Sequence, residues 1–142
     1  MKKFLCSALL AIMLFSCVTA AFAEAFTESI AYKVIVAEID TSLANWEPKY
    51  EYDDESKLFV ISLGCPDGTA ASLLLGTVPD SWQTVCDAMN QLCTTVKDAL
   101  TTAGHKDVQV SVVLRNDANE DNILFASFMG VTFFNAADVV KK

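Results

Sequence analysis

The apolar positions between residues 81 and 103 recur with the spacing of one face of an α-helix. They return every three or four residues over about six turns, with polar residues between them. This pattern predicts a long amphipathic helix with one buried face, formed by Trp82, Val85, Cys86, Met89, Leu92, Cys93, Val96, Ala99, Leu100 and Ala103. We expect this helix to lie on a sheet through Trp82, Met89 and Val96.

Both ends of this helix carry boundary signals. Asp80 is expected to cap its start, with Gln83 three residues later as the second half of a capping box. Gly104 follows the last apolar position, where a residue with left-handed backbone often ends a helix. No other segment of the sequence combines a helical period with both signals, so the other elements are expected to pack around this one.

The segment from residue 24 to residue 46 fits two structures. Its apolar residues form a helical stripe, but Tyr32 to Asp40 also alternates in the manner of a strand. Neither Gly nor Pro interrupts it from Glu24 to Glu47, which is longer than an ordinary strand. We therefore predict a helix that ends before Pro48.

A period of two residues marks the expected strands. They are Lys49–Tyr52, Lys57–Leu63, Val108–Arg115, Asn122–Phe128 and a short last strand at Val131–Phe134. Turn-forming residues separate the first pair at 53–56, the second pair at 116–121 and the last pair at Met129-Gly130. Strands joined by such short turns are antiparallel.

The order of these elements predicts one α+β domain. We expect a two-layer arrangement with a mostly antiparallel sheet of four or five strands packed by the long helix, an N-terminal helix, and a short connecting helix at Thr69–Leu75. Ala136–Lys142 is expected to be a tail. Residues 57–63 are apolar on both faces, so the first helix covers the second face of the sheet, or that face is a surface for a partner or a second copy.

The first 23 residues have the features of a secretory signal. Lys2 and Lys3 precede an uncharged apolar run from Phe4 to Val18, and Ala21-Phe22-Ala23 supplies the small residues before a cleavage point. Cleavage there leaves residues 24–142 as a single exported domain, secreted or in the cell envelope. Because the apolar run extends to Ala23, a membrane anchor is the alternative.

A second processing route would begin at Cys17. Leu14-Phe15-Ser16-Cys17 resembles the lipobox of bacterial lipoproteins, in which the cysteine is lipidated. Phe15 replaces the usual small residue, and Val18 to Ala23 is apolar where a polar tether is expected. Lipidation at Cys17 would attach the domain to a membrane, and it is the one route by which we expect membrane contact.

The charge of the chain narrows the range of partners. It has 18 acidic and 10 basic residues and a formal net charge of −8, and loss of Lys2 and Lys3 with the signal would make it more acidic. An acidic surface argues against nucleic acid and against anionic membranes as partners. No sequence fingerprint for a metal, nucleotide or redox cofactor is present, so we expect no cofactor.

Three cysteines remain after the signal: Cys65, Cys86 and Cys93. Cys86 and Cys93 are separated by roughly 10 Å along the predicted helix, so they cannot bridge each other. A disulfide would therefore join Cys65 with Cys86 or with Cys93, and export permits one. The alternative is that all three are small buried apolar residues.

Two acidic stretches are candidates for chemistry. Asp117, Asn119 and Asp121 place oxygen atoms at alternate positions, as in the first half of a calcium-binding loop, although Asn122 and Phe128 replace the later glycine and glutamate. Asp53, Asp54 and Glu55 offer an acidic pair. Both stretches also fit polar hairpin turns. His105, the one histidine, would have to lie beside a cysteine to activate it.

The layout from Tyr50 to Phe134 resembles small exported bacterial proteins of unknown function with a helix–hairpin–helix–hairpin order. The likeness rests on residues 108–117 and 123–127, and it implies no activity. The expected function is an exported non-catalytic binding or interaction domain for an unknown protein or small molecule, with a homodimer through a sheet face as one form. The alternatives are a small envelope enzyme using Cys65 or an acidic pair, and a secreted inhibitor or structural protein.

Overall fold

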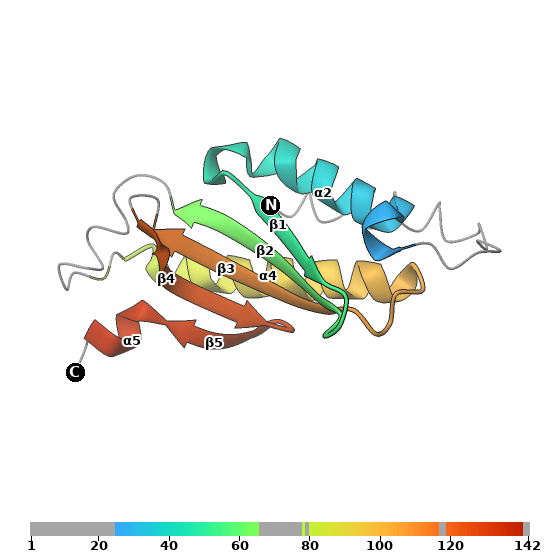
Figure 1. Ribbon diagram of the computed structural model, residues 1–142. Helices are drawn as coiled ribbons and strands as arrows, with labels where there is room; N and C mark the ends of the chain where they lie inside the picture. Colours follow the sequence, from blue (N-terminus) through green and yellow to red (C-terminus); the bar gives the residue numbers. More distant parts are fainter. Residues whose placement is uncertain (1–24, 66–77, 79, 117–118, 141–142) are drawn as a thin grey trace.

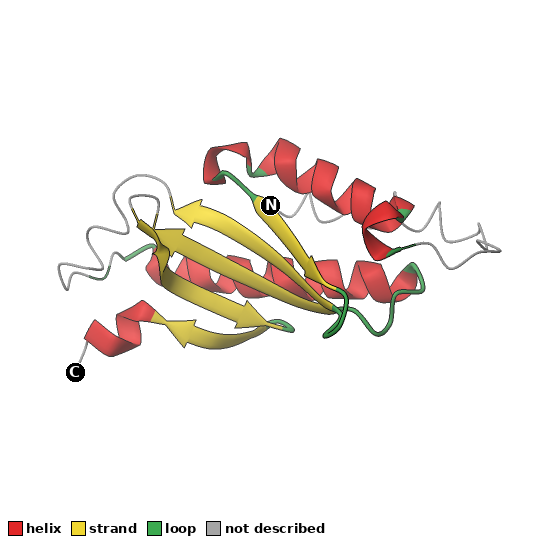
Figure 2. Ribbon diagram, in the orientation of Figure 1, coloured by secondary structure: helices red, strands yellow, loops and turns green. Residues whose placement is uncertain are grey.

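The computed structural model describes residues 25–65, 78, 80–116 and 119–140. Its elements in chain order are η1 (Phe26–Glu28), α2 (Ile30–Ser42), η2 (Ala44–Trp46), β1 (Lys49–Asp53), β2 (Leu58–Cys65), α4 (Trp82–Thr102), β3 (Gln109–Asn116), β4 (Asn119–Phe128), β5 (Val131–Asn135) and α5 (Ala136–Val140). The five strands form one sheet, crossed by the long helix α4 (Figures 1 and 2). The predicted α+β class is confirmed. The expected helix at 69–75 lies outside the described residues.

The sheet is mixed, which corrects the expectation of a mostly antiparallel sheet. Its strand order is β1-β2-β3-β4-β5, and β2 and β3 pair in parallel with Ile61 opposite Val112. The other neighbours pair antiparallel. The parallel pair arises because α4 lies between β2 and β3 in the chain and brings it back to the end where β2 began. Alternation of apolar residues gave no information on strand direction at this point.

Helix α4 packs on the sheet as the apolar period predicted. Trp82, Met89 and Val96 are all buried, as are the two helical cysteines. They belong to the same buried core as six apolar side chains of β2 and β3, which are Phe59, Ile61, Leu63, Val110, Val112 and Leu114. Burial of this large apolar face accounts for most of the stabilisation that α4 contributes, because a helix owes more to tertiary packing than to intrinsic propensity.

The two ends of α4 differ from each other in how well they were predicted. The N-cap is Ser81 rather than Asp80, and no side chain caps the N-terminus of the helix. Gln83 Nε2 donates instead to Asp87 Oδ1 at 2.9 Å, so the prediction of a capping box is wrong. At the other end, Gly104 has φ 98° as predicted. Its N–H donates to Thr101 O, and His105 N–H donates to Leu100 O, which together form a Schellman C-cap.

The N-terminal helix is shorter than expected and is divided by its own capping. Ser29 has extended backbone, and its Oγ accepts from Tyr32 N–H at 3.2 Å, which starts α2. A single turn of 3-10 helix precedes α2 and another follows it. Pro48 follows the second of these turns, as its restriction on the preceding backbone predicts.

Helix α2 lies on the face of the sheet that α4 also covers (Figure 1). Its Tyr32 ring is 5.4 Å from the ring of Phe59, a residue of the buried face of β2. Tyr50, which pairs with Ile61 across β1 and β2, donates its hydroxyl to Asp40 Oδ1 of α2 at 2.7 Å. In the described part of the chain, the first helix therefore does not cover the second face of the sheet.

The C-terminal segment is not a tail, because residues 136–140 form α5. Asn135 Oδ1 accepts from Ala137 N–H at 3.0 Å and caps the helix. The same oxygen accepts from Trp82 Nε1 at 2.9 Å, so one amide joins β5, α5 and the start of α4. An Asn followed by two alanines was the available sequence signal for this short helix.

Candidate functional site

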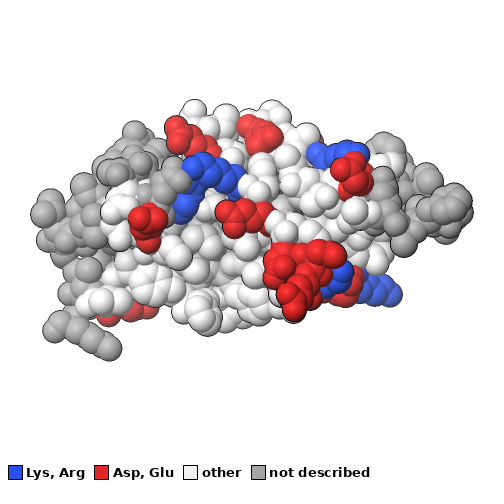
Figure 3. Space-filling view, in the orientation of Figure 1, with Lys and Arg blue, Asp and Glu red and all other residues white. Residues whose placement is uncertain are grey.

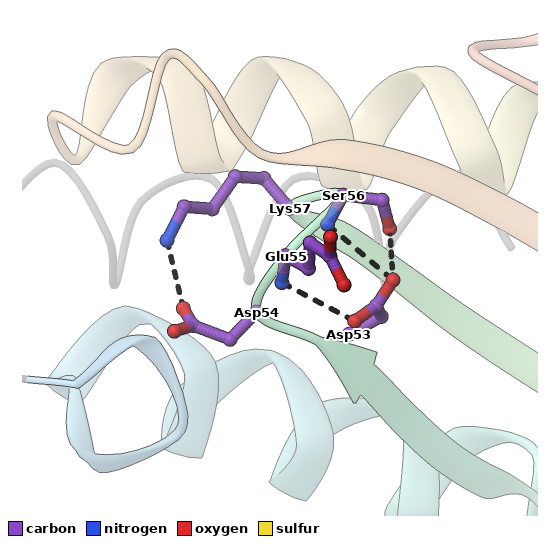
Figure 4. Close-up of polar contacts among 5 residues, drawn as sticks. All are labelled: Asp53, Asp54, Glu55, Ser56 and Lys57. Carbon is purple, nitrogen blue, oxygen red and sulfur yellow. Dashed lines mark hydrogen bonds and ion pairs between the residues drawn. The ribbon is translucent and has the colours of Figure 1, made fainter.

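The acidic cluster at the β1–β2 turn has local structural partners (Figure 4). Asp53 accepts from Glu55 N–H at 3.2 Å, from Ser56 N–H at 3.3 Å and from the Ser56 hydroxyl. Asp54 pairs with Lys57 Nζ at 2.7 Å. The Ser56 hydroxyl and these backbone donors hold the pKa of Asp53 below its usual value. The geometry is that of a polar turn, in which these carboxylates stabilise the chain reversal.

The calcium candidate is only partly described. Asp117 lies outside the described residues, while Asn119 and Asp121 belong to the start of β4 and are exposed. Asn119 Oδ1 accepts from Asp121 N–H at 3.2 Å, an ordinary local bond for asparagine. Within the described ranges, no group of three or more His, Cys, Asp or Glu side chains is arranged to hold a metal ion. The calcium site stays a prediction.

Cys65, Cys86 and Cys93, the three cysteines among the described residues, are buried. Cys93 Sγ donates to Val110 O at 3.3 Å and accepts from Gly130 N–H at 3.2 Å. Burial, and then the nearby carboxylates of Asp87 and Asp138, raise the pKa of Cys86 to about 12, with a further contribution from Cys65. A thiol with a raised pKa is a poor nucleophile at neutral pH, which argues against catalysis by Cys86.

His105 is not placed to activate the cysteines. It follows the C-terminus of α4, and its ring packs edge-on to Phe26 with centroids 5.4 Å apart. Cys86 lies near the opposite end of α4, roughly 30 Å away along the axis at 1.5 Å per residue. Cys65 pairs with Asn116 at the end of β3, whereas His105 precedes the first residue of that strand, Gln109. The structure thus separates the two members of the candidate Cys–His pair.

The carboxyl ends of β2 and β3 gather polar groups that sequence reasoning did not connect. Arg115 is buried, and its Nη2 donates to Glu47 O at 3.1 Å and to Ser62 O at 3.4 Å. Asn116 and Cys65 are paired neighbours at the ends of these strands and are also buried. Ligands often bind outside the carboxyl ends of parallel strands. The sequence offered one signal for this arrangement, because a helix predicted between two strands permits the strands to pair in parallel.

The second face of the sheet is here called the open face. Its side chains change from charged at β1 to apolar at β4 and β5. Strand registers place Lys49, Glu51 and Asp53 on this face of β1. Toward the other edge, the registers place Val113, Ala126 and Phe134 in one row, and Ser111, Phe128 and Val131 in the next. Phe128 is 40% exposed and Val131 is 70% exposed.

The apolar patch is defined as Val113, Ala126, Phe128, Val131 and Phe134. Phe133 lies beside it as the extra residue of a β-bulge opposite Ala126 and Ser127, and it is 83% exposed. Figure 3 shows charged side chains over the β1 side and the β1–β2 turn, whereas the surface over β4 and β5 is mostly uncharged. No described helix covers the patch (Figure 1). Exposed apolar surface concentrated in this way is typical of a binding surface.

No protein-family model, curated protein or solved structure matches this chain. Among the residues that the structure describes, no helix combines the length and hydropathy needed to cross a membrane.

Proposed function

We propose that this protein is an exported interaction domain that binds its partner on the open face of the sheet. The observation that supports this most is the apolar patch, because large side chains remain exposed there while both long helices pack on the other face. We propose a two-layer domain in which helices cover one face only. The residues offered for catalysis are engaged in structural contacts, so the binding role is favoured over the enzyme and inhibitor alternatives.

Export of residues 24–142 is part of the proposal. Phe26, close to the expected cleavage point, is buried at the edge of an aromatic cluster. Its ring contacts those of Tyr32, Tyr52, Phe59 and His105. A domain whose core already includes residue 26 fits cleavage before Glu24, with release into the envelope or medium. The resemblance to small exported bacterial proteins is in keeping with this proposal.

Two measurements test the proposal. Mass spectrometry of the protein from the exporting cell is expected to show a chain that starts at Glu24; a lipidated chain starting at Cys17 would replace release by membrane attachment. Hydroxyl-radical footprinting of the mature protein at low concentration is expected to modify Phe133 nearly as readily as in the unfolded chain, and Phe128, which is 40% exposed, to a lesser but clear extent. Protection of both in the isolated monomer would contradict an available binding face.

A further inference from the structure

The apolar patch differs from the β1 edge of the open face in carrying no charge. Glu51 and Asp53 lie on the β1 side, and Asp54 and Glu55 extend the negative charge into the turn. Two molecules of a chain with a net charge of −8 repel each other wherever such carboxylates meet. The patch is a part of the open face on which two copies can meet without that repulsion. A strongly charged partner, by contrast, would find no complementary charge there.

We propose that the occupant of the apolar patch is a second copy of this chain, which forms a two-fold symmetric dimer through the β4–β5 half of the open face. This inference rests on the proposed function and names its partner. In such a contact each residue of the patch is used twice, so a self-complementary apolar surface suffices. The two sheets then pack face to face, with their side chains interdigitating and the helices of each copy outward.

The size of the patch sets the strength of the dimer. Aromatic side chains bury roughly 150–250 Å² each, so the exposed parts of three patch residues, Phe128, Phe134 and Val131, and of the adjacent Phe133 together present on the order of 400 Å². That matches the largest apolar patches of single proteins, and it is about half of what each partner buries in a standard interface. We therefore expect a dimer that dissociates on dilution.

Sedimentation velocity of the mature protein, from micromolar to millimolar concentration, tests the dimer. In a two-fold symmetric dimer, Val131→Asp places one carboxylate from each copy in the proposed contact. Val131 is exposed enough for the substitution to leave the fold intact. The variant is expected to weaken dimerisation at least tenfold. Phe133→Ser, at a still more exposed side chain, is expected to weaken it without adding charge. Ile30→Asp adds the same charge on α2, 44% exposed and away from the open face, and is the matched control that should dimerise like the wild type.

The outcomes separate this inference from the proposed function. A concentration-dependent dimer that Val131→Asp and Phe133→Ser weaken, and Ile30→Asp does not, supports the second copy. A monomer at all concentrations whose Phe128 and Phe133 react readily in footprinting overturns the dimer and leaves the binding face for another partner. A monomer with both side chains protected overturns both proposals. A dimer insensitive to both patch variants overturns this interface.

Discussion

Gly130, in the turn between β4 and β5, lies directly against Thr94 of α4. A Cβ at residue 130 would collide with Thr94 Oγ1, would be 3.3 Å from Thr94 Cβ and would be 3.6 Å from Asn90 O. The N–H of Gly130 meanwhile donates to Cys93 Sγ. This close approach fixes the β4–β5 hairpin, whose other face carries the apolar patch, against the long helix.

Gly130→Ala is therefore expected to lower the free energy of unfolding by about 2 kcal/mol or more, measured by urea denaturation. The substitution combines an unfavourable backbone, since φ is 84°, with the collision at Thr94. Gly104→Ala is the matched control, because its φ is 98° but no atom lies within 4 Å of the added Cβ. The control should lose only about 1 kcal/mol from backbone strain. Equal losses at the two glycines would show that the contact with Thr94 contributes nothing.

Asn135 is expected to stabilise the C-terminal part of the fold through a single oxygen. Asn135→Ala leaves the buried indole N–H of Trp82 without its acceptor and removes the cap of α5, at an expected cost of about 2–3 kcal/mol. Asn135→Asp keeps an acceptor at the same place and should retain most of the stability. Urea denaturation of the two variants makes the comparison. If alanine and aspartate destabilise equally, the hydrogen bond is not the cause.

Stability is expected to fall at alkaline pH. Burial raises the pKa of Cys86 from 9.0 to about 12, and burial together with the bond to Asp40 raises the pKa of Tyr50 above its ordinary value of 10.0. Both groups hold their proton more tightly in the folded state. Their contribution is therefore complete below the pKa of the unfolded chain and is lost as the pH rises toward the folded pKa.

The measurement is the free energy of unfolding as a function of pH. The free energy of unfolding of the wild type should be constant up to about pH 9. Above that, each group should lower it by up to about 1.4 kcal/mol per pH unit. Cys86→Ala should flatten the curve from about pH 9 and Tyr50→Phe from about pH 10, whereas Ile30→Ala should leave its shape unchanged. If the wild-type curve is as flat as those of Cys86→Ala and Tyr50→Phe, the loss of stability at alkaline pH does not come from these two groups.

The long helix could be predicted from the sequence because its period, its C-terminal glycine and its apolar face all agree. The strands of the β1–β2 and β3–β4–β5 units were likewise predictable from alternation and turn residues. The parallel pairing of β2 with β3 was not, since side-chain alternation is the same in either direction. The side covered by α2 also depended on tertiary contacts, such as that of Tyr32 with Phe59, which no local pattern encodes.

The candidate chemistry was harder to predict for a related reason. Asp53 and Cys86 were candidates by residue type, but their partners decide what they do: Asp53 binds its own turn, and Cys86 is buried beside carboxylates. The exposed face was anticipated as one of two alternatives. Its charge gradient was not anticipated, because it arises from the order of the strands across the sheet, and this order became known only from the structure.

Cys93 is expected to remain a thiol when the mature protein is oxidised. Its side chain is fully buried, its thiol donates to Val110 O, and its sulfur accepts from Gly130 N–H. A disulfide bond to this sulfur would break the contact between the β4–β5 turn and α4. Cys65 and Cys86 both belong to the buried core, and the sulfur of Cys86 is in neither of the contacts that hold Cys93. We therefore predict that any bridge joins Cys65 to Cys86.

Peptide mapping by mass spectrometry, after labelling with N-ethylmaleimide, distinguishes these states. In the folded protein Cys93 should label only after addition of urea, because burial shields it and raises its pKa. Cys93→Ala should leave the mapped bridge unchanged, whereas Cys86→Ala should abolish it. A bridge between Cys65 and Cys93, or rapid labelling of Cys93 in the native state, would contradict the packing of this cysteine beneath Gly130. Labelling of Cys65 and Cys86 alike, after urea is added to the oxidised protein, would instead show that neither is bridged, which is the alternative of three small buried apolar residues.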